Sequence, residues 1–285
     1  MIVTRFAPSP TGYLHLGHAF AATLAHDTAR RHGGRFLLRI EDIDKSRSRP
    51  EFEEAICEDL AWLDLHWEQP VLRQSDRFES YRDALSELAA RGLLYPCFCT
   101  RARVAAEIAQ SVEAPHGSEG PRYPGICRDL SDAERNARIE SGAAYALRLD
   151  VRKAAAGVAP LQFQELGSGP NGERGEIVAN PLLFGDVVLA RKDTPASYHL
   201  AVVIDDAFQG VTLVTRGNDL FAPTHVQRLL QALLNFPAPD YAHHRLILDP
   251  DGRKFSKRDN AVTLRCLREN GVTPEQIRER LGLAE

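Results

Sequence analysis

The 285-residue sequence contains no hydrophobic run of the length that crosses a bilayer. Its N-terminus also lacks the apolar core of a secretory signal peptide. No internal repeat or low-complexity tract is present. With 44% hydrophobic and 26% charged residues, the composition is that of an ordinary globular protein long enough to bury a sizeable core. We therefore expect a cytoplasmic protein that has no membrane partner.

The sequence also has few cysteines and no excess of positive charge. The five cysteines are few and odd in number, which argues against a disulfide framework. The chain has 35 Lys and Arg against 39 Asp and Glu, a net charge of -4, so its composition does not indicate a general nucleic-acid binder. Any contact with RNA would have to come from local basic patches.

The N-terminal stretch 5–18 is the most distinctive part of the sequence. A short apolar strand, 2–6, runs into a loop punctuated by proline and glycine, and a helix begins near Leu16. Such a strand–loop–helix aims backbone N–H groups and the positive end of the helix at an anion. His15 and His18 lie three residues apart on one turn and can face the same ligand. The alternative is a plain strand–turn–helix that carries two surface histidines.

Strands and helices alternate along most of the chain, which predicts an α/β fold with a doubly wound parallel sheet. Expected strands cover 35–41, 197–206 and 211–215, and expected helices cover 19–32, 50–65, 76–91, 223–235, 263–270 and 274–281. Ligands of such sheets bind beyond the carboxyl ends of the strands. The first and last of these strands end at Glu41 and Arg216, which are therefore candidate site residues. The alternative for Glu41 and the acids that follow it is that they cap the next helix.

The region 95–190 differs in character and contains most of the cysteines. Thiolates bind zinc tightly, and four ligands close a structural tetrahedron. The alternative is that these are small buried side chains in a reduced cytosol, as we expect for Cys57 and Cys266. The spacing leaves the fourth ligand open between Tyr123 and His116. The candidate thiolates are Cys97, Cys99 and Cys127.

Two motifs carry a family resemblance. The run Arg-Phe-Ala-Pro-Ser-Pro-Thr-Gly at 5–12, followed by His-Leu-Gly-His, resembles the first nucleotide-binding motif of class I aminoacyl-tRNA synthetases, in particular of their glutamyl branch. The basic loop Arg-Lys-Phe-Ser-Lys-Arg at 253–258 resembles the second motif, although alone it could be a solvated surface. The runs at 39–44 and 62–67 are similar to bacterial glutamyl-tRNA synthetases. Both motifs in the right order make the resemblance specific.

The resemblance implies a role for each matching residue. Arginine grips carboxylates bidentately, an acid suits the α-ammonium group, and positive charge must stand where charge develops on the phosphates. Val202 replaces an asparagine usual in the family, which implies weaker glutamate binding. The implied glutamate site is Arg5, Phe6, Ala7, Pro8, Ser9, Glu41, Tyr198 and Arg216. The implied ATP site is His15, Gly17, His18, Lys254, Ser256 and Lys257, of which His15, His18 and Lys257 assist catalysis. Mg²⁺ is expected with ATP, and the resemblance supports Tyr123 as the fourth zinc ligand.

The resemblance also implies a domain organisation. We expect a Rossmann-like catalytic domain at 1–94 and 191–248, an inserted α+β subdomain at 95–190 that binds RNA and zinc, and a basic loop with a short helical tail at 249–285. We expect no anticodon-binding domain. This organisation resembles the glutamyl-Q tRNA(Asp) synthetases, which activate glutamate without tRNA and esterify it to queuosine in the anticodon loop of tRNA(Asp). The alternatives are a minimal glutamyl-tRNA synthetase that charges tRNA(Glu) and a non-catalytic paralogue that binds RNA or nucleotide. We expect a monomer.

Overall fold

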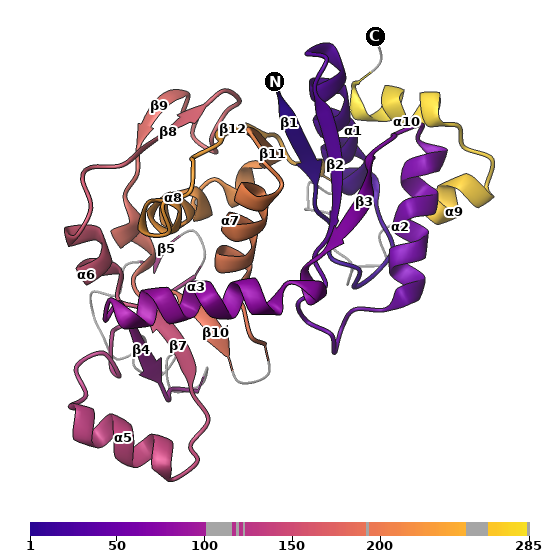
Figure 1. The fold of residues 1–285 in the computed structure, drawn as a ribbon. Coiled ribbons are helices and arrows are strands. Elements are labelled where there is room, and N and C mark those ends of the chain that lie inside the picture. The colour runs from indigo at the N-terminus through magenta and orange to yellow at the C-terminus, as the bar shows by residue number, and fades with distance from the viewer. Residues whose placement is uncertain (101–115, 118–119, 122, 192–193, 249–261, 284–285) are drawn as a thin grey trace.

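The computed structural model describes residues 1–100, 116–117, 120–121, 123–191, 194–248 and 262–283. Its centre is a parallel sheet in two halves (Figure 1). The first half contains β1 (Val3–Phe6), β2 (Arg35–Ile40) and β3 (Glu68–Arg73), all parallel, in the order β1-β2-β3. The second contains β11 (Leu213–Gly217), β12 (Asp240–His244), β8 (Gln162–Glu165) and β9 (Gly175–Val178), in the order β11-β12-β8-β9. Only β9 runs antiparallel to its neighbour.

The two halves meet at β1 and the residue before β11. The Thr212 N–H donates to the Val3 carbonyl at 3.0 Å, and the Val3 N–H donates to Thr212 Oγ1 at 2.9 Å. The strand order across the molecule is therefore β3-β2-β1-β11-β12-β8. The order in which the strands follow one another along the chain reverses between β1 and β11. Ligands of open α/β sheets bind at such a reversal. The predicted parallel α/β fold is confirmed.

Helices gather on both halves of the sheet (Figure 1). Those near the first half are α1 (Leu16–Arg31), α2 (Pro50–Trp62), α9 (Leu264–Glu269) and α10 (Pro274–Leu281). Those near the second are α7 (Tyr198–Phe208) and α8 (Pro223–Leu233), with η3 (Asn218–Leu220) between β11 and α8. After η1 (Gln74–Asp76), α3 (Phe78–Ala90) leads from β3 to the lower part of the molecule.

One predicted strand was wrong, because residues 197–206 form most of helix α7 with its N-cap. The Ser197 hydroxyl accepts the Leu200 N–H at 3.4 Å and starts the helix. Every residue from Leu200 to Asp206 is buried, so this part of the helix has no side that faces solvent. A short, mainly apolar run that is buried on all sides cannot be assigned to helix or strand by periodicity.

The inserted part carries an antiparallel sheet of β4 (Leu94–Cys97), β7 (Ala146–Leu149) and β10 (Val188–Arg191), in the order β10-β7-β4. Its other elements are the short strands β5 (His116–Gly117) and β6 (Gly120–Pro121), α5 (Asp132–Glu140), α6 (Val151–Ala156) and η2 (Pro181–Phe184). Strands β8 and β9 lie within the range 95–190 that we expected to be inserted, yet they belong to the main sheet, where β8 pairs with β12 and β9 pairs with β8. The chain therefore returns to the main sheet before it forms β10.

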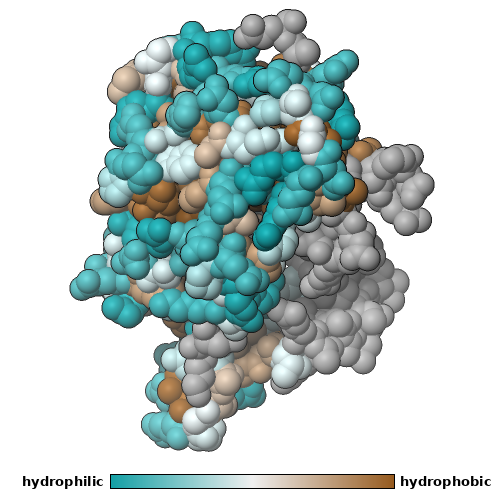
Figure 2. Space-filling view, turned by 90° about the vertical axis from the view of Figure 1, so that its right-hand side faces the viewer, coloured by the Kyte–Doolittle hydropathy of each residue, from teal (hydrophilic) through white to brown (hydrophobic). Residues whose placement is uncertain are grey.

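Two large apolar clusters hold these layers together. One lies between α3, α7 and α8, and the other lies beneath α1, α2, α9 and α10, where Leu264, Ile277 and Leu281 are almost wholly buried. The outer surface on the side of α2, α9 and α10 is mainly hydrophilic (Figure 2). Among the described residues, no helix is both long and apolar enough to cross a membrane.

Candidate active site

Arg216 lies at the carboxyl end of β11, and polar groups hold its guanidinium on three sides. Nη2 donates to the Thr224 hydroxyl at 2.7 Å, Nε donates to His243 Nε2 at 3.1 Å, and Nη1 donates to the Tyr198 hydroxyl at 3.4 Å. The Tyr241 ring lies 5.3 Å from the guanidinium carbon. Tyr198 is the first residue of α7, so the helix rather than a strand delivers it to Arg216.

Arg5 and Glu41, at the ends of β1 and β2, are connected through a buried ionic network. Arg5 Nε donates to Asp206 Oδ1 at 2.9 Å. Arg39 donates to the same Asp206 oxygen at 2.6 Å and to Glu41 Oε1 at 3.2 Å. Burial raises the pKa of Glu41, and the nearby Arg39 and Arg5 oppose that rise. Burial also acts on Asp206, but Arg5 and Arg39 outweigh it and lower the pKa of Asp206. The network holds the Glu41 carboxylate at the edge of the sheet where strand order reverses.

The loop after β1 brings the remaining residues that were predicted to bind glutamate to the same edge. Phe6 ends β1 and is buried, and Ala7 and Ser9 are partly buried. The Pro8 carbonyl accepts the Glu41 N–H at 2.9 Å, so the loop is tied directly to the end of β2. The structure therefore brings the residues that were predicted to bind glutamate together around the ends of β1, β2 and β11.

His15 and His18 form the start of α1. The His15 Nδ1 accepts the Gly17 N–H at 3.1 Å, and the His18 Nδ1 accepts the His15 N–H at 3.2 Å. The two rings are in contact, with centroids 3.7 Å apart and planes tilted by 34°. Because both Nδ1 atoms are acceptors, a neutral ring carries its proton on Nε2. A Cβ on Gly17 would lie 3.1 Å from the His15 ring, so glycine permits this close packing.

The predicted ATP residues Lys254, Ser256 and Lys257 lie outside the described residues. The described chain resumes just beyond them and meets the histidine motif. Thr263 forms an antiparallel bridge with His15, and the Leu264 N–H donates to the Leu14 carbonyl at 2.8 Å. The segment that follows the basic loop is thus anchored beside the N-terminus of α1.

The predicted metal ligands converge at the end of β4. The Sγ atoms of Cys97, Cys99 and Cys127 all lie within 4.8 Å of one another. The Tyr123 hydroxyl lies 3.3 Å from the Cys97 sulfur and 3.6 Å from the Cys99 sulfur. A tetrahedral zinc with Zn–S bonds of about 2.3 Å needs sulfur atoms roughly 3.8 Å apart. The three sulfur atoms and their spacing therefore fit zinc, and the tyrosine oxygen lies beside them.

The surroundings shift the pKa values of two of these thiols in opposite directions, and burial raises the pKa of Cys99 to about 11. Burial raises the pKa of Cys97, but hydrogen bonds from the Tyr123 hydroxyl, the Cys99 N–H and Arg148 outweigh it and lower the pKa overall. The Arg148 guanidinium lies 3.8 Å from the Tyr123 ring centroid. A nearby guanidinium suits thiolates, which are the form of cysteine that binds metal.

Comparisons with known proteins agree with this geometry. Residues 1–284 match the family described as tRNA synthetases class I (E and Q), catalytic domain. The chain belongs to this class I synthetase family. It is 50% identical to the glutamyl-Q tRNA(Asp) synthetase of Rhodobacter capsulatus, covering 99% of this chain and 100% of that protein. It is 46% identical to the protein of the same name from Symbiobacterium thermophilum, with 97% and 84% covered.

A solved structure extends the comparison to the fold of this class I catalytic domain. The glutamate-tRNA synthetase of Elizabethkingia anophelis matches with a TM-score of 0.74 and 29% identity, over 90% of this chain. The chain spans 53% of that synthetase, about half its length. The described fold therefore corresponds to about half of that longer class I synthetase.

Several residues of this class I site were not predicted from the sequence. Arg39 and Asp206 pair beneath Glu41, while Thr224 and His243 hold Arg216. The acids that end the apolar run 197–206 could be recognised in the sequence as charged residues beside a segment that was expected to be buried. No local pattern marked His243, because the polar strand Asp240–His244 does not have an apolar alternation.

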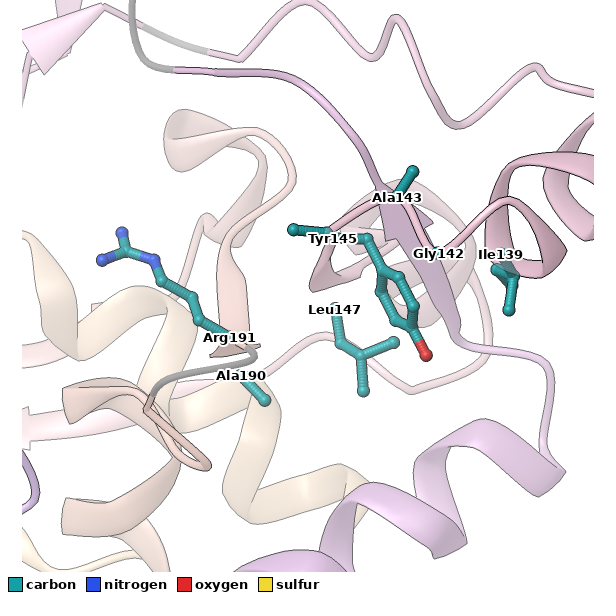
Figure 3. A pocket seen from close by; sticks show the side chains of 8 residues that line it. Ile139, Gly142, Ala143, Tyr145, Leu147, Ala190 and Arg191 are labelled. Carbon is teal, nitrogen blue, oxygen red and sulfur yellow. The ribbon is translucent and has the colours of Figure 1, made fainter.

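The inserted sheet of this synthetase carries a separate hollow of about 380 Å³. Figure 3 shows the Tyr145 ring close to Leu147, with Ile139 beyond the ring and the Arg191 guanidinium extending in the opposite direction. Tyr145 also packs on Phe98 with ring centroids 5.7 Å apart. The lining residues are Ile139, Gly142, Ala143, Ala144, Tyr145, Leu147, Ala190 and Arg191. This hollow lies at β7, β10 and the end of α5, apart from the residues around Arg216.

Proposed function

We propose that this synthetase activates glutamate with ATP in the absence of tRNA and transfers it to queuosine in the anticodon loop of tRNA(Asp). The observation that carries the proposal is the 50% identity to a glutamyl-Q tRNA(Asp) synthetase along the full length of that protein. The contacts of Arg216, Tyr198 and Glu41 supply the chemistry that such a substrate needs.

In this proposal the side-chain carboxylate of glutamate binds Arg216 and the Tyr198 hydroxyl, because arginine matches carboxylate geometry with two parallel donors. The α-ammonium group binds Glu41. The wall of the glutamate site on the side of β1 is formed by Arg5, Phe6, Ala7, Pro8 and Ser9. The α-carboxylate is then left to attack the α-phosphate of ATP, which enters as its Mg²⁺ complex.

ATP binds at the start of α1. His15, His18 and the backbone near Gly17 contact the phosphates and the adenosine, since the helix N-terminus favours anions. The second motif, with Lys254, Ser256 and Lys257, covers the departing pyrophosphate. The anchoring of Thr263 against His15 supports this, because it holds the segment that follows the basic loop beside the first motif. Catalysis is then mainly positioning and charge stabilisation.

The inserted part binds zinc and tRNA in this proposal. Zinc, held by Cys97, Cys99, Tyr123 and Cys127, supplies a closed structural tie between β4 and the segment around Cys127. The exposed Tyr145 next to Phe98, with Arg138 over the Phe98 ring at 5.5 Å, suits the stacking of unpaired bases. We propose that this surface meets the anticodon loop and that the enzyme acts as a cytoplasmic monomer.

Two measurements separate the proposed function from its alternatives. ATP–pyrophosphate exchange that depends on glutamate and needs no RNA is expected, and a non-catalytic paralogue would show none. After transfer of labelled glutamate to total tRNA, nuclease digestion should leave the label on the modified nucleoside of the anticodon loop. Label on the terminal adenosine would instead indicate a minimal glutamyl-tRNA synthetase.

A further inference from the structure

A buried pair, Glu165 and His243, stands directly behind Arg216. The two side chains are wholly inaccessible to solvent, and Glu165 Oε2 lies 2.5 Å from His243 Nδ1. The other carboxylate oxygen accepts the His243 N–H at 2.9 Å and the Gly167 N–H at 2.8 Å. Three donors therefore surround the Glu165 carboxylate, which a buried acid needs if it is to keep its charge.

The sheet register places the pair where it can act on Arg216. Arg216 on β11 is paired with His243 on β12, and Tyr241 on β12 is paired with Glu165 on β8. The chain also passes very close to His243. A Cβ at Gly167 would lie 2.2 Å from the His243 carbonyl oxygen, so only glycine permits this approach.

The hydrogen bonds define the protonation of the His243 ring. Arginine has only donors, so His243 Nε2 must accept the Arg216 Nε–H at 3.1 Å. The ring proton therefore lies on Nδ1 and is donated to Glu165. Burial lowers the pKa of His243, and the charge of Arg216 lowers it further, against the opposing hydrogen bond to Glu165. A neutral ring thus connects the carboxylate to the guanidinium.

This connection fixes the plane of the Arg216 guanidinium. Nε is held by His243 and Nη2 by Thr224, which are both buried. The Nη1 edge faces Tyr198, where the hydrogen bond is the longest of the three at 3.4 Å. Two short bonds on one side therefore direct the Nη1 edge toward the glutamate site. The Glu165 carboxylate also offsets the buried positive charge before the substrate arrives.

We infer that Glu165 and His243 are positioning residues, which orient Arg216 for the side-chain carboxylate of glutamate. The inference rests on the proposed function, because it takes Arg216 as the residue that binds this carboxylate. Neither residue touches the reacting atoms. Their loss should therefore weaken the binding of glutamate without changing the binding of ATP.

The test is glutamate-dependent ATP–pyrophosphate exchange by the full chain in four variants. In Glu165→Gln the amide can donate to His243 and drive the ring proton to Nε2, where it opposes the Arg216 Nε–H. In His243→Leu the acceptor is lost. We expect the KM for glutamate to rise at least tenfold in both, with the KM for ATP and kcat within about threefold of wild type, since each variant loses a buried hydrogen bond to a charged group that fixes Arg216. In His243→Gln the side-chain oxygen can still accept from Arg216, so most of the loss should be restored.

The matched control is His225→Leu, which removes another buried histidine that accepts a backbone N–H from Asn180 and does not contact Arg216. It should leave the KM for glutamate unchanged. An unchanged KM for glutamate in folded Glu165→Gln and His243→Leu would overturn the inference, as would an equal loss for glutamate and ATP in those two variants. A KM for glutamate in His243→Gln as high as in His243→Leu would overturn it too. Absence of any glutamate-dependent exchange by the wild type would show that the proposed function itself fails.

Discussion

Arg5 and Arg216 approach the same site with different electrostatic surroundings. Arg5 is bound to the Asp206 carboxylate, and Arg39 binds that carboxylate too. Arg216 is held by a hydroxyl, a phenol and an imidazole, and within the part of the chain that the structure describes it forms no ion pair. The positive charge that a substrate carboxylate can use is therefore concentrated at Arg216.

Replacement of that charge should abolish amino-acid activation. We predict that Arg216→Ala lowers kcat/KM for glutamate by at least about a hundredfold, since loss of a buried charge partner typically removes 3 kcal/mol or more. Pyrophosphate exchange measures this directly. Arg228→Ala on α8, which removes an arginine bonded to the Gln162 carbonyl, is the control and should retain activity. Normal exchange by Arg216→Ala would refute the assignment of this residue.

The cysteine cluster makes a second prediction at the residue scale. Wild-type protein should retain zinc after gel filtration, at one ion per chain, because four donors converge near the end of β4. Cys127→Ser should lose most of that metal, whereas Cys57→Ser, at a half-buried thiol on α2, should keep it. Metal analysis of the purified proteins checks both. Well under one zinc per chain in the wild type would rule out the structural site.

At the scale of elements, local sequence signals predicted the ends of helices better than the identity of short buried segments. Helices were expected at 263–270 and 274–281, and α9 and α10 begin at Leu264 and Pro274, capped by Thr263 and Thr273. The helix expected at 19–32 ends at Arg31, and Gly33 follows it with φ 56°. By contrast, the apolar run 197–206 was assigned to a strand. Burial on all sides removes the periodicity that distinguishes helix from strand. Strands such as β12 were missed because their pairing, rather than their own pattern, makes them strands.

The contact between α2 and α9 makes a prediction about pH. Asp59 on α2 is wholly buried, and its carboxylate oxygens accept no hydrogen bond from the described residues, with Arg268 of α9 at 3.7 Å. Burial raises the pKa of Asp59 to about 6, against the opposing charge of Arg268. The folded state then binds this proton more tightly than the unfolded state. The free energy of unfolding should therefore fall as the pH rises from about 4 to 6.

Asp59→Asn should remove this part of the pH dependence and stabilise the protein above pH 7 by about 1–2 kcal/mol, because one pKa unit corresponds to about 1.4 kcal/mol. Denaturant unfolding at several pH values measures it. The comparison variant is Glu58→Gln, since that neighbouring carboxylate is exposed and pairs with the same arginine. A less stable Asp59→Asn protein at pH 8 would mean that the ion pair with Arg268 outweighs the burial of the charge.

At the scale of the molecule, residues from distant parts of the chain form the candidate site. The sequence motifs pointed to arginines, acids and histidines that the structure brings to one edge of the sheet, because each ends a strand or starts a helix near the reversal of strand order. The partners of Arg216 could not be predicted, since Thr224, His243 and Glu165 come from α8, β12 and β8. Their proximity depends on the register of three strands, which local patterns do not encode.

The inserted sheet makes the prediction for tRNA. Tyr145→Ala should raise the KM for tRNA about tenfold, because base stacking on an aromatic ring is worth about 1–3 kcal/mol. ATP–pyrophosphate exchange should be unchanged, since Tyr145 lies in the hollow of the inserted part. Tyr145→Phe keeps the ring and should behave like the wild type. If all three proteins had the same KM for tRNA, this surface would not contact the RNA.

The most direct test of the central claim uses two pools of total tRNA, one from normal cells and one from cells that cannot make queuosine. Wild-type protein is incubated with ATP, labelled glutamate and each pool, and label in tRNA is counted. Our account predicts that label enters only the normal pool, because queuosine supplies the hydroxyl that accepts glutamate. Equal label in both pools would contradict it and indicate a synthetase that charges the terminal ribose.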